Sequence, residues 1–124
     1  MGLDMYLTKR RRGANPEDVL VAYWRKANHI HGWFERNVSD GYIENCELYP
    51  VCLNDLNCLM SDCRLVKEDR TKAATILPTE EGFFFGGTEY GERYFEGIDC
   101  TISQLEKVIA EASEGDELFY HAWW

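Results

Sequence analysis

The sequence predicts an α+β fold: a single domain over residues 1–124, in which about three helices pack on one face of a small, mainly antiparallel sheet. Segments with the two-residue periodicity of strands stand near both ends of the chain, and segments with helical periodicity lie between them. The connections are short, which favours antiparallel neighbours. With 124 residues, 45% of them hydrophobic, the chain can build one core.

The first predicted element is a strand from Leu3 to Lys9. Leu3, Met5 and Leu7 alternate with more polar residues, which is typical of a strand with one buried face. A run of four cations, residues 9–12, ends the strand and forms a local basic patch.

A long helix is predicted next, from Pro16 to Asn37. Asn15 suits the N-cap position, and proline is favoured at the first helical position. Spacings of three and four predict that one stripe of this helix is buried. The stripe consists of Leu20, Tyr23, Ala27, Ile30 and Phe34.

The middle of the chain predicts a short strand, a helix and an extended piece. The strand covers Cys46–Val51, and Pro50 removes a backbone donor, which favours the edge of the sheet. A helix capped by Asn54 follows, and Thr75–Leu77 is expected to be extended. The helix is expected to bury Leu56, Leu59, Cys63 and Val66.

The last third predicts a Phe-rich segment, a helix and a strand. Phe83–Phe85 stand between glycines, as in a short buried strand or a tight turn. The alternating segment Glu117–Trp124 is expected to be a strand within the sheet. The helix before it, capped by Asp99 or Thr101, is expected to bury Ile102, Leu105, Ile109 and Ala112.

The composition argues against several classes of binding partner and cofactor. A net charge of −9 opposes direct nucleic-acid binding, and no apolar run reaches the length of a membrane helix. We therefore expect a cytoplasmic protein without membrane or nucleic-acid partners. The five cysteines, an odd number without a C-x-x-C pair, are expected to be reduced and mostly buried. No nucleotide-binding motif is present, and we expect no cofactor.

The candidate site combines two segments. On the predicted helix, Trp24, Asn28 and His31 form a stripe beside the buried one, with Arg25 just beyond it. The glycine-rich segment 86–91 could present backbone N–H groups to an anion. We predict that both line one concave surface that binds a small anionic ligand. The predicted ligand-binding residues are Trp24, Arg25, Asn28, His31, Gly87, Thr88 and Tyr90.

Alternatives stay open for both segments. His31 could serve only packing, and residues 86–91 could form a turn that needs positive φ. His29 and His31 are two residues apart, which places them on nearly opposite sides of a helix, so no metal site is predicted. No residue is singled out as catalytic.

Three motifs are distinctive: MGLDMYL at residues 1–7, YWRKANxIHxWF at 23–34 and LPTxxGFFFGxTxY at 77–90. Together they resemble the motifs of a family of small bacterial and phage proteins, and the resemblance spans most of the chain. It implies a phage or prophage context and supplies no catalytic residues.

We expect a binding protein rather than an enzyme, one that recognises a host protein or a small anionic ligand, for example in counter-defence. Two alternatives stay open. One is a small enzyme with His31 as general acid and base. The other is an acidic mimic of nucleic acid, favoured by the net charge of −9. The oligomeric state is not predicted.

Overall fold

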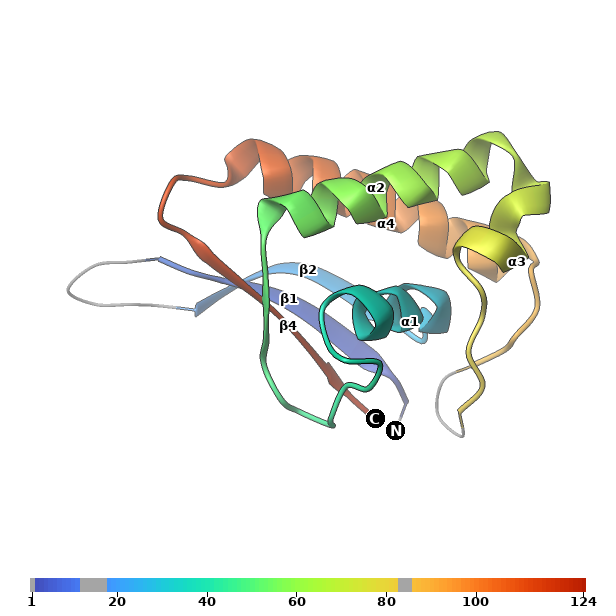
Figure 1. Ribbon diagram of the computed structural model, residues 1–124, viewed down its shortest axis with the longest axis horizontal. Coiled ribbons are helices and arrows are strands. Elements are labelled where there is room, and N and C mark those ends of the chain that lie inside the picture. Colours follow the sequence, from blue (N-terminus) through green and yellow to red (C-terminus); the bar gives the residue numbers. More distant parts are fainter. Residues whose placement is uncertain (1, 12–17, 83–85) are drawn as a thin grey trace.

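The computed structural model describes residues 2–11, 18–82 and 86–124, and it confirms the α+β class (Figure 1). A four-stranded antiparallel sheet has the strand order β2-β1-β4-β3. Its strands are β1 (Asp4–Arg10), β2 (Asp18–Arg25), β3 (Tyr49–Val51) and β4 (Glu117–Trp123). The helices are α1 (Asn28–Asn37), α2 (Leu53–Glu68), α3 (Ala73–Ile76), α4 (Glu92–Glu111) and the 3-10 helix η1 (Arg70–Lys72).

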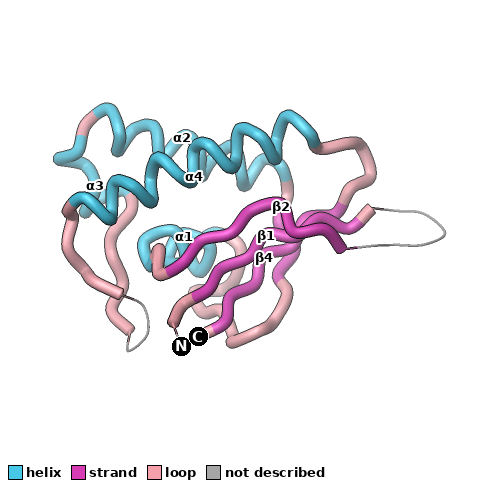
Figure 2. The backbone as a smooth tube through the Cα atoms, turned by 180° about the vertical axis from the view of Figure 1, so that it is seen from behind, coloured by secondary structure: helices cyan, strands magenta, loops and turns pink. Residues whose placement is uncertain are grey.

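The predicted terminal strands are confirmed and form the centre of the sheet. Along β1 and β4, buried and partly exposed residues alternate, so one face of the sheet meets the core. The helices pack on that face: α2 and α4 lie side by side, with α1 beneath them next to the strands (Figures 1 and 2). The buried row consists of Leu3, Met5, Leu7, Leu118, Tyr120 and Ala122.

The first half of the long predicted helix is wrong, because Asp18–Arg25 is strand β2. Leu20 is 54% exposed and Tyr23 is 40% exposed, so neither belongs to the core. Residues 19–24 form an apolar run that fits both periodicities, and pairing with β1 decides in favour of a strand. The expected cap at Asn15 lies outside the described residues.

The second half of that prediction is correct. Helix α1 begins at Asn28, and Ala27, Ile30 and Phe34 are buried as expected. The ring of Phe34 stacks on that of Tyr120 with centroids 3.9 Å apart, which fixes α1 against β4.

The predicted middle strand and the helix after it are present, with shifted boundaries. Helix α2 buries the four expected residues, and β3 lies at the sheet edge. The predicted extended piece is wrong, since residues 75 and 76 belong to the short helix α3. Helix α4 begins at Glu92 rather than near Asp99. Phe83–Phe85 lie outside the described residues.

The cysteines are free, as expected, but only Cys63 is buried, so the expectation that most are buried is wrong. No helix in the described residues combines the length and apolar character needed to cross a membrane.

Candidate functional site: a cleft at the start of α4

A cleft of about 1010 Å³ opens between the end of β2, the start of α1 and the first half of α4. We call it the α4 cleft. Its walls come from three parts of the chain: residues 23–29, residues 86–91 with Thr79, and residues 92–100. Of the predicted site residues, Trp24, Arg25, Asn28 and Gly87 line it.

The turn between β2 and α1 brings cations to one wall. Lys26 has a φ of 55°, the left-handed conformation, and its N–H donates to the Leu3 carbonyl at 2.7 Å. The side chains of Arg25 and Lys26 both pass close to Gly2: a Cβ built there would lie 3.0 Å from Lys26 Cε and 3.8 Å from Arg25 Nη2. The turn therefore gathers two exposed cations at the mouth of the cleft.

Residues 77–82 and 86–91 contribute to the next wall and are held by Asn28. The buried Asn28 amide donates through Nδ2 to the Gly87 carbonyl at 2.9 Å, and its Oδ1 accepts from the Glu80 N–H at 2.9 Å. The Thr79 hydroxyl donates to the Thr88 carbonyl at 2.9 Å, which joins the two arms that run side by side in Figures 1 and 2. The Asn28 side chain thus links Glu80 and Gly87 by hydrogen bonds and holds this wall in position.

His29 is a site residue that the sequence prediction missed. Its side chain lines the cleft, only 4% of the residue is exposed, and its ring stacks on Tyr94 with centroids 4.2 Å apart. Nε2 is buried without a hydrogen-bond partner among the described residues. Burial lowers the pKa of His29 to about 4, and the nearby Tyr94 backbone offsets this only in part. The ring is therefore neutral at pH 7.

Because residue 97 is a glycine, there is room for the His29 ring beside it. A Cβ there would lie 3.0 Å from Cε1 and 3.1 Å from Nε2 of His29. The floor beside it is fixed by Trp24, whose indole N–H donates to the Thr101 hydroxyl at 2.8 Å. The floor of the cleft is therefore formed by packed aromatic rings, and it holds one buried polar atom without a partner among the described residues.

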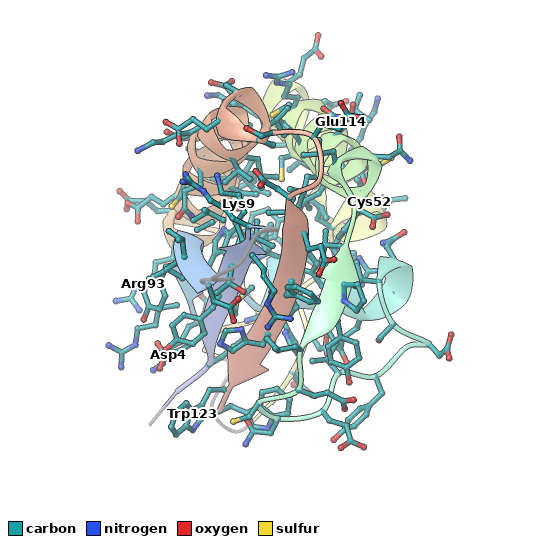
Figure 3. All side chains as sticks on the ribbon, turned by 90° about the vertical axis from the view of Figure 1, so that its left-hand side faces the viewer. Asp4, Lys9, Cys52, Arg93, Glu114 and Trp123 are labelled. Atoms are coloured by element: carbon teal, nitrogen blue, oxygen red, sulfur yellow. The ribbon has the colours of Figure 1, made fainter. Side chains whose placement is uncertain are left out.

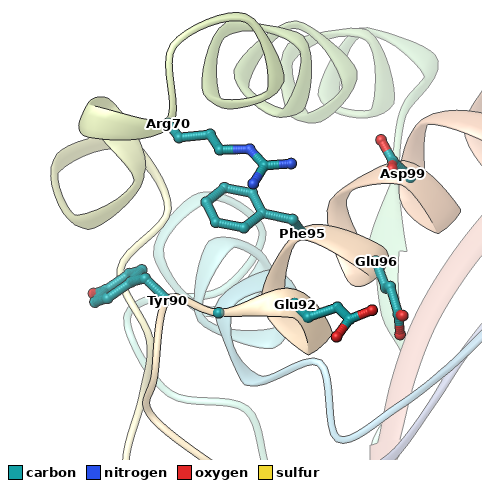
Figure 4. Close-up of a pocket in the computed structure, with 7 residues that line it drawn as sticks. Arg70, Tyr90, Glu92, Phe95, Glu96 and Asp99 are labelled. Carbon is teal, nitrogen blue, oxygen red and sulfur yellow. The ribbon is translucent and has the colours of Figure 1, made fainter.

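The rim carries charges of both signs. Three exposed cations face the cleft, and so do three exposed carboxylates. In the described part of the chain, none of these six side chains forms an ion pair. Figure 3 shows Arg93 on the β2 side of the molecule, and Figure 4 shows Glu92 and Glu96 extending to the same side of α4. The six are Arg25, Lys26, Arg93, Glu89, Glu92 and Glu96.

His31 does not face the cleft, and that part of the predicted geometry is wrong. The residue is 1% exposed, its Nδ1 lies 2.7 Å from the Tyr120 hydroxyl, and its Nε2 lies 3.7 Å from Glu35 Oε1. Because α1 begins only at Asn28, its helical phase turns His29 toward α4 and His31 toward β4. His31 belongs to the core.

Thr88 and Tyr90 also lie outside the α4 cleft. The Tyr90 hydroxyl accepts from the Thr79 N–H at 3.1 Å, and Thr88 contributes the carbonyl already described, so both hold the wall. Tyr90 lines a neighbouring groove of about 300 Å³, where the Arg70 guanidinium lies 4.3 Å from the Phe95 ring centroid (Figure 4).

No protein family, curated protein or solved structure matches this chain in the comparisons. Within the described residues, no three side chains of the metal-binding types come together in a way that could hold an ion.

Proposed function

We propose that this protein is a non-enzymatic binding protein whose α4 cleft holds a small ligand with an anionic group. The observation that carries this proposal is the set of three exposed cations that line the α4 cleft, Arg25, Lys26 and Arg93. None of them has an ion-pair partner among the described residues. A local group of unpaired cations can attract an anion even on an acidic protein.

The backbone adds to this attraction. The first N–H groups of an α-helix have no partner within the helix, and its dipole favours negative charge there. Gly91, which precedes α4, makes no side-chain cap. An anion at this end of the cleft would therefore meet free backbone donors as well as cations.

A binding role fits better than general acid and base catalysis by His31. Both ring nitrogens of His31 lie near groups of the core, and the ring has no access to the cleft. The phage or prophage context implied by the three motifs belongs to the same proposal: the protein would sequester a metabolite of the host.

Native mass spectrometry of the protein purified from bacterial cells tests this function. We expect wild type to carry a small-molecule adduct that the Arg25→Glu/Arg93→Glu variant lacks. Arg64→Glu is the matched control, because Arg64 pairs with Glu106 away from the cleft. An adduct retained by the double variant, or a wild type without one, would contradict the proposal.

A further inference from the structure

We propose that the ligand of the α4 cleft is a small zwitterion, a molecule with an ammonium group and an anionic group separated by a short apolar spacer. This inference rests on the proposed function and specifies the ligand class. It starts from the two signs of charge on the rim.

Opposite charges that come close elsewhere on the described surface do pair. Three such contacts between oppositely charged side chains are 2.7 to 3.0 Å long: Arg10 with Asp18, Arg64 with Glu106, and Lys67 with Asp99. Around the α4 cleft, three cations and three carboxylates stay unpaired within the same described part of the chain. The cleft therefore keeps its opposite charges apart.

Two of the cations and two of the carboxylates come from different walls, while Arg93 stands on α4 between the two carboxylates. Arg25 and Lys26 stand on the turn after β2, whereas Glu92 and Glu96 stand one helical turn apart on α4. A carboxylate in the first turn stabilises the helix dipole, which accounts for Glu92, but Glu96 lies beyond that turn. Two like charges at this spacing also disfavour a helix slightly. Helix stability therefore accounts for Glu92 but does not account for Glu96.

This arrangement discriminates by charge. The carboxylates of α4 would repel a simple anion bound at Arg25 and Lys26. The arginines and the lysine would repel a simple cation. A molecule with both charges gains from both walls. The apolar floor at Trp24, with the unpartnered Nε2 of His29 beside it, suits a short hydrocarbon spacer with a hydrogen-bonding group.

Isothermal titration calorimetry with a matched panel tests the inference. The panel contains linear ω-amino acids from glycine to 6-aminohexanoate, the alkanoates of equal length and the corresponding alkylamines. We expect the best ω-amino acid to bind at least about tenfold tighter than its alkanoate and its alkylamine, a gain of about 1.4 kcal/mol. The preferred length reports the separation of the two walls.

Two variants test whether the binding measured by calorimetry takes place in the α4 cleft. Glu92→Gln/Glu96→Gln should remove most of the preference for the amino acid and should bind the plain alkanoate more tightly, because the repulsion is gone. Glu106→Gln changes the same charge on the same helix outside the cleft and should behave as wild type.

The outcomes separate the two proposals. Equal binding of amino acid and alkanoate would overturn the zwitterion and leave the anion-binding function standing. Tightest binding of the alkylamine would overturn both. If no compound binds, the zwitterion inference is overturned, and the native mass spectrometry experiment decides the function by itself.

Discussion

Lys26 adopts a backbone conformation that most residues avoid, with a φ of 55°. For a residue with a Cβ, the left-handed region costs roughly 1–2 kcal/mol, a cost that glycine does not bear. Strained positions of this kind are found at functional sites. Here the conformation places the side chain of Lys26 at the mouth of the α4 cleft.

Two substitutions at Lys26 test whether its backbone is strained. Lys26→Gly should be about 1 kcal/mol more stable than Lys26→Ala, because only alanine keeps the Cβ in the left-handed region. Both variants should bind ligand more weakly than wild type, since both lack the cation. Chemical denaturation measures the first difference and calorimetry the second. A glycine variant less stable than the alanine variant would show that the backbone is not strained.

Glu35 in α1 and Glu80, which follows α3, form a pair of neighbouring carboxyl groups. Burial and the neighbouring Glu80 carboxyl raise the pKa of Glu35 to about 8, while Arg36 offsets this only in part. His31 and Tyr120 face the same carboxyl from α1 and β4. Glu35 therefore carries a proton at neutral pH that the unfolded chain would have lost.

The free energy of unfolding depends on pH because these groups bind protons differently in the folded and unfolded states. Between pH 4.5 and 8 the folded state binds a proton at Glu35 that the unfolded state does not, so stability falls as the pH rises. Burial lowers the pKa of both His29 and His31 to about 4, so stability also falls as the pH drops below 6.5. Stability should therefore be greatest near pH 6.5.

Glu35→Gln should abolish the loss of stability between pH 6.5 and 8, because glutamine keeps the hydrogen bond to Glu80 without an ionisable proton. Urea denaturation across this pH range measures the effect. Glu106→Gln, on an exposed side chain paired with Arg64, should keep the wild-type slope. If the Glu35→Gln slope equals that of wild type, another group carries the pH dependence.

Helices and strands are predicted best from the sequence where the apolar residues fit only one periodicity. Helix α2 follows because Leu56, Leu59, Cys63 and Val66 fit only the helical period, and all four are buried. Strand β2 does not follow, because residues 19–24 are apolar in a continuous run. Pairing with β1, a contact between segments, settled that ambiguity.

The contact between α1 and β4 is expected to be a main source of stability. Phe34 is fully buried and stacks on Tyr120, so Phe34→Ala should cost roughly 3–5 kcal/mol. Urea denaturation gives the value, and Phe34→Leu should lose clearly less because it leaves a smaller cavity. A midpoint unchanged by the alanine substitution would refute the stacking of α1 on the sheet.

At the scale of the whole molecule, the sequence placed the site only in part. Trp24, Arg25, Asn28 and Gly87 do line one cleft, although Trp24 and Arg25 reach it from a strand rather than a helix. The sequence could show that His29 and His31 point to opposite sides of a helix. Which one faces a cleft depended on how α1 packs between α4 and β4, and no local pattern records that. That these residues bind a ligand stays a prediction.

A ¹H–¹⁵N correlation titration with the tightest compound of the calorimetry panel tests whether the α4 cleft is the ligand site. We expect saturable shifts at the amides of Lys26, His29, Gly87 and Gly97, which line the cleft. Amides of β3, at the far edge of the sheet, should stay unchanged. Shifts centred on β3, or in the groove around Arg70 and Phe95 with the cleft amides unmoved, would contradict it.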